Sequence, residues 1–198
     1  GTGTISTACT ALAAERGIEL YLLNRGQRQV ELPPGVQVLK GDINEDRAGV
    51  AALLAEHSFD VVVDWIAFRV DQVERDIELF GGKTGQYIFI SSASAYQKPI
   101  THHRITEATP LANPFWQYSR DKIACEDRLM QEYRQNGFPM TVVRPSHTYG
   151  PASLPTAVGG GATVVSRIRA GKKVIVHGDG ESLWVMTHNT DFAKAFVG

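Results

Sequence analysis

A tyrosine and a lysine stand four residues apart, at Tyr118 and Lys122, in a stretch whose apolar residues recur at helical spacing. One helical turn separates them, so both side chains leave the same helix face. A tyrosine phenol has a pKa of about 10 and is a weak base at neutral pH. A positive charge about 4 Å away, at an effective dielectric of roughly 20, contributes roughly 4 kcal/mol, or about 3 pKa units. The spacing therefore predicts proton transfer by Tyr118 with Lys122 lowering its pKa; the alternative is a half-buried tyrosine beside a solvated lysine.

Small hydroxyl residues follow a short apolar run earlier in the chain. The run ends in the segment 91–96, which reads Ser-Ser-Ala-Ser-Ala-Tyr and includes Ser92 and Ser94. In open parallel sheets, ligands bind at the carboxyl ends of the strands. These hydroxyls can orient a substrate oxygen there, or they can close a turn.

The chain opens on a glycine-rich turn, Gly1-Thr-Gly3-Thr-Ile-Ser6, that runs directly into a helical pattern. It resembles the tail of a dinucleotide-binding turn, in which glycines let the backbone approach a pyrophosphate at a helix N-terminus. No strand precedes it, so we expect a first strand to be missing from this sequence. A plain helix cap is the alternative.

The residues after the next apolar run bear on the choice of cofactor. A carboxylate at that place binds the ribose 2′-hydroxyl of NAD, whereas here Asn24 and Arg25 occur, with Arg28 nearby. A guanidinium can bind a 2′-phosphate bidentately, which favours NADP over NAD. Asp42 is placed to hold the adenine amino group, or to cap the following helix.

Short β-branched runs alternate with longer amphipathic stretches. Strands are predicted at residues 19–24, 36–40, 60–65, 87–91, 140–144 and 173–176, and helices at 5–13, 45–57, 70–80 and 164–170 and around Tyr118. This alternation predicts an α/β fold, a doubly wound parallel sheet with helices on both faces. After Pro151 this pattern of the sequence changes. We therefore expect a dinucleotide-binding domain at 1–151 and the truncated beginning of a substrate-binding domain at 152–198.

Composition limits the remaining classes. The chain has 198 residues, 43% hydrophobic and 21% charged, enough to bury a sizeable core. Its formal net charge of -1 gives no sign of a nucleic-acid or membrane field. Two cysteines are too few for a disulfide scaffold or a metal knuckle, so we expect no metal site and a reducing compartment. With neither a leader nor an 18-residue apolar run, a cytoplasmic protein is expected.

Together these motifs resemble the extended branch of the short-chain dehydrogenase/reductase superfamily, the NAD-dependent epimerase/dehydratase family. Ser92, Tyr118 and Lys122 look like its Ser-Tyr-Lys triad. Residues 144–151, Arg-Pro-Ser-His-Thr-Tyr-Gly-Pro, resemble its RPxNxYGP segment, and Gly178-Asp-Gly180 with His188 and Asp191 resembles its GDG turn and the following helix start. The resemblance covers nearly the whole chain and implies a Rossmann-like fold.

The resemblance also implies roles for particular residues. Tyr118 would be the general acid or base at a secondary alcohol or ketone, Lys122 would lower its pKa and bind the nicotinamide ribose, and Ser92 would hydrogen-bond the reacting oxygen. The cofactor-binding residues expected on this basis are Gly1, Gly3, Ile5, Asn24, Arg25, Arg28, Asp42, Ile43, Trp65, Ala67, Tyr118, Lys122 and Pro145. Ser94 and His147 are the substrate-contact candidates.

Three positions depart from the family pattern. Sugar-nucleotide 4,6-dehydratases of this family carry an Asp-Glu pair where this chain has Ala93 and Ser94, which argues against a dehydratase. His147 stands where Asn is usual and is either an additional acid or base or a packing substitution. Trp184 stands where an arginine would bind a nucleotide-sugar phosphate, which puts a sugar-diphosphate substrate in doubt.

The leading hypothesis is an NAD(P)-dependent epimerase or reductase acting on a sugar-like small molecule. Two alternatives stay open, an RNA-binding relative of the chloroplast stem-loop binding proteins and a non-catalytic NADP-binding sensor. The near-neutral charge argues against nucleic acid as a partner. A homodimer formed through the helix that carries Tyr118 is possible, with Leu129, Met130 and Tyr133 serving either that contact or the core.

Overall fold

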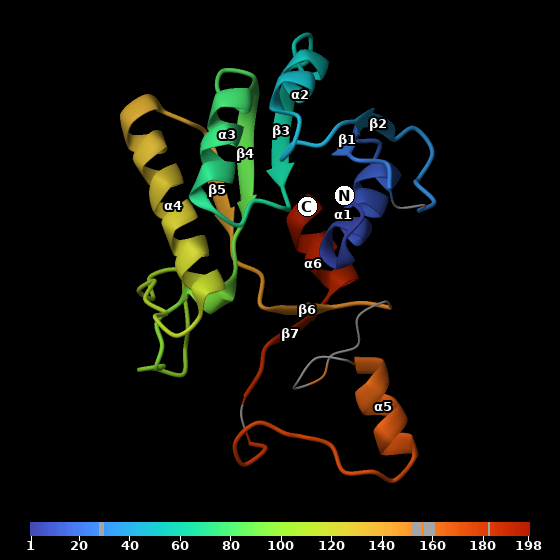
Figure 1. The fold of residues 1–198 in the computed structure, drawn as a ribbon, viewed down its shortest axis with the longest axis vertical. Helices are drawn as coiled ribbons and strands as arrows, with labels where there is room; N and C mark the ends of the chain where they lie inside the picture. Colours follow the sequence, from blue (N-terminus) through green and yellow to red (C-terminus); the bar gives the residue numbers. More distant parts are fainter. Residues whose placement is uncertain (28–29, 152–155, 157–160, 182) are drawn as a thin grey trace. The chain divides into compact units, whose positions relative to one another are not determined.

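The computed structural model describes residues 1–27, 30–151, 156, 161–181 and 183–198 (Figure 1). Packing divides the chain into two compact units, described here separately. The first unit combines Gly1–Lys40 with Ser146–Gly198, and the second unit is Gly41–Pro145. These units are defined by packing alone, so the domain boundary expected between residues 151 and 152 stays a prediction.

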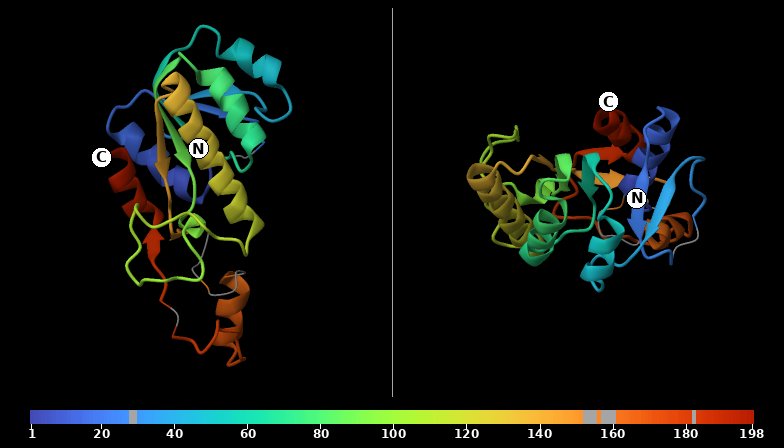
Figure 2. Two further views of the ribbon diagram at one scale, coloured as in Figure 1. Left: turned by 90° about the vertical axis from the view of Figure 1, so that its left-hand side faces the viewer. Right: turned by 90° about the horizontal axis from the view of Figure 1, so that it is seen from above.

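The second unit is built on a parallel sheet of three strands in the order β3-β4-β5. Its elements are α2 (Arg47–Leu53), β3 (Phe59–Asp64), α3 (Val70–Phe80), β4 (Thr84–Ile90), the short 3-10 helix η1 (Ala93–Ala95), α4 (Gln117–Asn136) and β5 (Met140–Val143). Helices α3 and α4 lie side by side against one face of this sheet (Figures 1 and 2). Tyr87 and Phe89 of β4, Val73 of α3 and Leu129 of α4 are fully buried and form the centre of this core.

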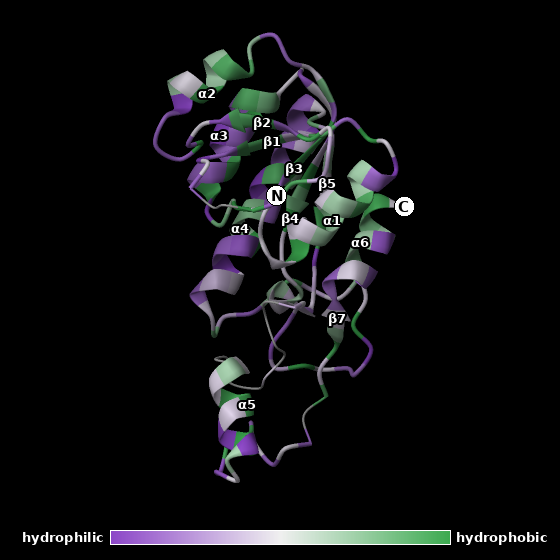
Figure 3. Cartoon of the chain, turned by 90° about the vertical axis from the view of Figure 1, so that its right-hand side faces the viewer, coloured by the Kyte–Doolittle hydropathy of each residue, from purple (hydrophilic) through white to green (hydrophobic). Residues whose placement is uncertain are grey.

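Helix α4 carries the tyrosine and lysine, and its buried stripe is unusually polar. Its buried residues follow helical spacing and are Ser119, Lys122, Cys125, Glu126 and Leu129. In Figure 3 much of α4 is purple whereas β4 is green, which matches a polar helix packed on an apolar strand. The helix ends at Gly137, whose φ of 71° is left-handed and suits glycine. Leu129 is buried while Met130 and Tyr133 are exposed, and a homodimer through α4 stays a prediction.

The first unit contains two pairs of parallel strands, β1 with β2 and β6 with β7. Its elements are α1 (Thr4–Glu15), β1 (Tyr21–Asn24), β2 (Gln37–Lys40), β6 (His147–Tyr149), α5 (Gly161–Arg169), β7 (Met186–His188) and α6 (Asn189–Val197). Helices α1 and α6 lie side by side (Figure 1). Asn189 donates to the Thr4 carbonyl at 2.9 Å and Arg16 to the Val197 carbonyl at 3.0 Å, which ties the two ends of this unit together.

The predicted α/β architecture with parallel strands is confirmed, and most predicted elements are present within a few residues of their expected bounds. The strand predicted at 173–176 is wrong, since the Lys173 carbonyl accepts from the Arg167 guanidinium and Ile175 and Val176 are exposed. Apolar β-branched residues form a strand only where a neighbouring strand pairs with them. Strands β6 and β7 were not predicted.

Helix α2 is shorter than the predicted 45–57 at both ends. Asp46 caps its start by accepting from the Gly49 amide at 2.9 Å, and the helix ends at Leu53 with Leu54 as its C-cap. Along the parts of the chain that the structure describes, no helix is both long and apolar enough to cross a membrane.

Candidate active site

Tyr118 lies in the first turn of α4, half-buried between two aromatic side chains. Its ring is 4.7 Å from that of Trp116 and 6.2 Å from that of Phe68, measured between centroids. Burial raises the pKa of Tyr118, and a hydrogen bond with the Ser92 hydroxyl opposes that rise. Trp116, the N-cap residue of the helix, remains 56% exposed, so one side of this aromatic group faces outward.

Ser92 is placed by the end of β4. It is the N-cap of the 3-10 turn Ala93–Ala95, and its Oγ accepts from the Ser94 amide at 3.2 Å. The backbone of this turn is fixed in addition by the Ala93 amide, which donates to the Pro145 carbonyl at 2.9 Å. The Ser92 hydroxyl thus closes a turn, and its orientation of a substrate oxygen stays a prediction.

Lys122 lies one turn further along α4, and its side chain is almost completely buried at 1% exposure. Its ammonium donates to the Ala67 carbonyl at 2.6 Å and to the Ile90 carbonyl at 2.7 Å. The rings of Phe68 and Phe89 each have their centroid 4.6 Å from Nζ, which adds cation–π contacts. Burial lowers the pKa of Lys122 to about 8. The alternative of a solvated lysine is therefore wrong.

Lys122 was expected to lower the pKa of Tyr118, but burial has the larger effect on that pKa and raises it. The ammonium lies 5.8 Å from the centroid of the Tyr118 ring and is directed at two carbonyls. The pKa of Tyr118 is raised, with burial the largest cause and the Ser92 hydrogen bond the opposing one. Activation of Tyr118 by Lys122 stays a prediction, and the tyrosine holds its proton at neutral pH here.

Ser94 and His147 were the substrate candidates, and each has structural contacts. The Ser94 hydroxyl accepts from Ser119 Oγ at 2.9 Å. His147, in β6 of the first unit, is half-buried with its ring edge-on to Trp184 at 5.6 Å, and Trp184 stacks on His177 at 5.3 Å. These contacts fit a packing role for both residues, and their contact with substrate stays a prediction.

Asn113 and Asp64 were not among the site residues predicted from the sequence. The Asn113 amide donates to the Ser94 carbonyl at 2.7 Å and to Ser119 Oγ at 3.3 Å, which fixes the loop against the start of α4. Asp64 is the last residue of β3, and its Oδ1 accepts from the Ala67 amide at 2.9 Å. The Asn113-Pro114 pair just before the helix could have indicated a structural role for Asn113. Asp64 was overlooked because it lies at the end of an apolar run that was predicted as a strand.

The expected cofactor residues of the first unit gather around two chain turns. Helix α1 begins at Thr4, just after Gly3, and its first turn carries no acidic residue. Ile5 is half-buried, and the Gly3 amide donates to Ser6 Oγ at 2.9 Å. The leading amides of a helix lack carbonyl partners within it and attract an anion. A turn of small residues with a carboxylate-free helix start is a donor set that fits a pyrophosphate.

At the end of β1, Asn24 Oδ1 accepts from the Gly26 amide at 2.8 Å, so this side chain shapes the turn that carries the exposed Arg25. Arg28 lies outside the described residues. The terminal amine of Gly1 donates to Thr10 Oγ1 at 2.8 Å. Binding of a cofactor by these residues stays a prediction.

The remaining cofactor candidates lie in the second unit, which also holds the triad. Asp42 accepts from the Asn44 amide at 3.1 Å, and since Asp46 caps α2, Asp42 is not the helix cap. Trp65 is half-buried, and its place beside a cofactor stays a prediction. The other three candidates act through their backbone carbonyls, Ile43 toward Arg75, Ala67 toward Lys122 and Pro145 toward the Ala93 amide.

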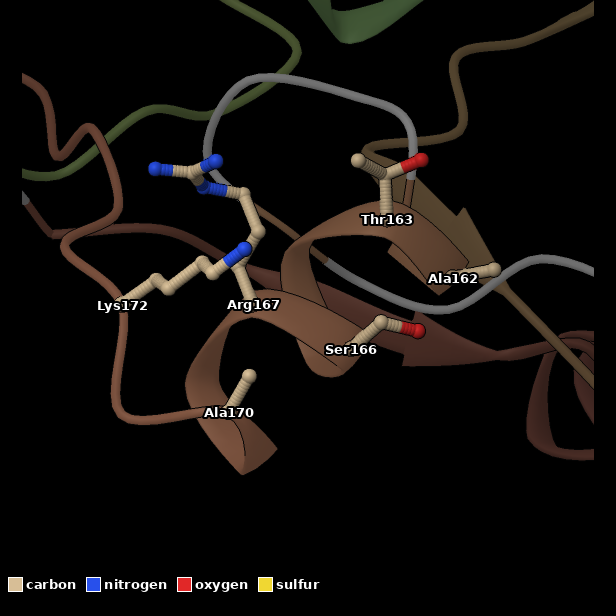
Figure 4. Close-up of a pocket in the computed structure, with 6 residues that line it drawn as sticks. All are labelled: Ala162, Thr163, Ser166, Arg167, Ala170 and Lys172. Carbon is tan, nitrogen blue, oxygen red and sulfur yellow. The ribbon is translucent and has the colours of Figure 1, made fainter.

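A shallow hollow also lies along α5 in the first unit. It is lined by Ala162, Thr163, Ser166, Arg167, Ala170 and Lys172 (Figure 4). The Arg167 guanidinium is already engaged by the Lys173 carbonyl. None of the site residues that the structure describes lines this hollow.

The model of the NAD dependent epimerase/dehydratase family matches residues 78–197. No curated protein matches the chain in sequence. Solved structures that are similar include Pal from Bacillus thuringiensis, with 22% identity and a TM-score of 0.78. A UDP-glucuronic acid 4-epimerase from Bacillus cereus, in complex with UDP-glucuronic acid and NAD, is 19% identical with a TM-score of 0.76. A UDP-glucose 4-epimerase from Thermotoga maritima, with UDP-glucose, is 21% identical with a TM-score of 0.77.

Each of these three alignments covers 98% of this chain and 69% of the other. At identities this low the structural similarity establishes the fold alone, and the Rossmann-type fold is as predicted. The comparisons give no support to the RNA-binding alternative.

Proposed function

Because the chain belongs to the NAD-dependent epimerase/dehydratase family, we propose that it transfers a hydride and a proton at a secondary alcohol or ketone of a sugar-like small molecule. The observation that carries the proposal is the Lys122 ammonium, buried against the Ala67 and Ile90 carbonyls one helical turn from Tyr118. Ser92 supports it, because its hydroxyl lowers the pKa of Tyr118 against the effect of burial. All three residues lie in the second unit, so the proton-transferring part of the proposed site belongs to one compact unit.

Each residue of the triad has its own proposed role. A bound nicotinamide ring supplies the hydride acceptor or donor. In the reduction direction, Tyr118 donates its proton to the substrate oxygen as that oxygen gains charge, and its raised pKa keeps the proton in place beforehand. Ser92 donates a hydrogen bond to the same oxygen. In the oxidation direction, Tyr118 takes the proton back, and the Lys122 ammonium stabilises the phenolate.

Epimerisation and simple reduction use the same proton and hydride, and both are compatible with these residues. Elimination of water needs an additional acid and base, and Ala93 and Ser94 supply neither. We therefore propose an epimerase or reductase and not a 4,6-dehydratase. Two of the similar structures are UDP-sugar 4-epimerases. The family resemblance implies that Trp184 of this chain stands where an arginine would bind a nucleotide-sugar phosphate, so we propose a sugar-like substrate without commitment to a diphosphate.

The cofactor is proposed to be a nicotinamide dinucleotide, and within the first unit the residues proposed to bind it are those of the α1 turn, Asn24 and Arg25. The solved neighbour with NAD supports that class of cofactor. The preference for NADP rests on Arg25 and on the missing carboxylate at the end of β1.

The proposed function is tested by incubating the protein with NAD⁺ or NADP⁺ and UDP-glucose, UDP-glucuronic acid or the free sugars, and with NADPH and sugar ketones. Sugar configuration is read by NMR and dinucleotide oxidation by absorbance. Configuration change or NADPH consumption that depends on Tyr118 supports the proposal. Dinucleotide binding with no turnover on any of these substrates would favour the sensor alternative.

A further inference from the structure

The backbone that holds the Lys122 ammonium is itself held by two side chains. Asp64 Oδ1 accepts from the Ile66 amide at 2.6 Å and from the Ala67 amide at 2.9 Å. On the other side, Gln72 Oε1 accepts from the Phe68 amide at 2.7 Å. The Phe68 amide belongs to the same peptide unit as the Ala67 carbonyl, so Gln72 and Lys122 hydrogen-bond to the two ends of one peptide.

The two side chains share a support behind this segment. Arg75 lies 3.7 Å from Asp64 Oδ2 and donates to Asn44 Oδ1 at 2.6 Å. Gln72 Nε2 donates to the same Asn44 oxygen at 3.2 Å. Asp64 and Arg75 have side chains only 7% exposed. A closed set of contacts thus runs from Asp64 through Arg75 and Asn44 to Gln72, with residues 66–68 between its ends.

Asp64 also acts through its charge. Burial disfavours the Lys122 ammonium, and the carboxylates of Asp64 of β3 and Glu126 of α4 oppose this effect and raise the Lys122 pKa. A peptide whose amide already donates a hydrogen bond presents a stronger carbonyl acceptor at its other end. Geometry and charge therefore both bear on where the ammonium sits.

We propose that Asp64 and Gln72 are positioning residues of the active site, which fix the backbone at 66–68 so that the Ala67 carbonyl holds the Lys122 ammonium. This inference rests on the proposed function for the role of Lys122. A purely structural role would instead make these contacts part of the packing of α3 on the sheet, like those of Asp76, which accepts from Tyr87 at 2.7 Å and from Arg75.

The test uses Gln72→Ala, which removes the acceptor, Gln72→Glu, which keeps it, and Asp64→Asn, which removes the charge. Gln86→Ala is the matched control, since Gln86 of β4 donates to Thr141 Oγ1 at 2.9 Å and does not touch residues 66–68. The first readout is the NMR signal of the Lys122 ammonium in lysine-labelled protein without ligands, identified by its loss in Lys122→Arg.

Gln72→Ala and Asp64→Asn should move the Lys122 signal, and Asp64→Asn should also lower the Lys122 pKa. They should lower kcat by about tenfold, the rate equivalent of one ordinary hydrogen bond, with KM for substrate nearly unchanged. Gln72→Glu should restore both readouts, and the Gln86→Ala control should leave the Lys122 signal in place. An unmoved Lys122 signal in Gln72→Ala and Asp64→Asn would overturn the proposal. If the signal moves but Lys122→Met retains full activity, the positioning stands and the proposed function fails.

Discussion

Glu126 of α4 and Arg144 at the end of β5 form a bidentate ion pair, in which Arg144 Nη2 lies 2.6 Å from Glu126 Oε2 and Nε lies 3.0 Å from Oε1. Glu126 is one helical turn from Lys122 on the same buried stripe. Glu126 Oε1 also accepts from Ser91, and Arg144 donates to the Tyr96 hydroxyl at 3.1 Å. The pair therefore fixes the register of α4 against the ends of β4 and β5.

Breaking that pair should destabilise the protein substantially. Glu126→Gln leaves the Arg144 guanidinium without its charged partner in a largely buried place, which costs about 3 kcal/mol. Urea unfolding measures the loss. Asp71→Asn is the matched control, since Asp71 pairs with Arg69 on the surface and its removal should change stability by less than about 0.5 kcal/mol. Equal effects of the two substitutions would contradict the assignment of the Glu126–Arg144 pair as an anchor.

The buried ammonium predicts a particular pH dependence of stability. The pKa of Lys122 is about 8 in the folded protein, below its ordinary 10.5. Between these values the unfolded chain holds a proton that the folded chain has lost, so stability rises with pH. Relative to Lys122→Met, the unfolding free energy of the natural chain should increase by roughly 3 kcal/mol across this window. Parallel pH profiles for the two proteins would contradict the burial of a titrating ammonium.

The sequence predicted the helix with Tyr118 and Lys122 and the strands on either side because their apolar periodicity is strong. It did not reveal that Lys122 is buried, since burial depends on two carbonyls, one from the loop after β3 and one from the end of β4. Asp64 was hidden as the last residue of an apolar run. Strands β6 and β7 have three residues each and form through pairing with each other, which local sequence does not carry.

Ser92→Ala should change both the reaction rate and its pH dependence. Loss of the hydrogen bond at the reacting oxygen should lower kcat by about a hundredfold. Because the Ser92 hydrogen bond lowers the Tyr118 pKa, the limb of the pH profile that reports Tyr118 should move to higher pH.

Ser119→Ala is the control for Ser92, since its hydroxyl contacts Asn113 and Ser94. It should cost about 1 kcal/mol of stability without moving that limb. A pH profile that is identical in Ser92→Ala and the natural chain would exclude contact between Ser92 and the proton-transferring group.

Arg25→Ala should reveal which dinucleotide the protein prefers. If Arg25 binds a 2′-phosphate, its removal should weaken NADPH by about tenfold or more, since a charge-assisted hydrogen bond contributes about 1.5–3 kcal/mol. The affinity for NADH should stay unchanged, because NADH has no such phosphate. Fluorescence titration measures both. Tighter binding of NADH than NADPH by the natural chain would contradict the proposed preference for NADP.

The central claim is that Tyr118 transfers the proton that accompanies the hydride. Tyr118→Phe removes only the hydroxyl and keeps the ring between Trp116 and Phe68. The measurement is single-turnover hydride transfer in Tyr118→Phe beside the natural chain, with the dinucleotide dissociation constant of each. The account predicts hydride transfer slowed by at least about a hundredfold with dinucleotide affinity nearly unchanged. Hydride transfer at the natural rate in Tyr118→Phe would contradict it.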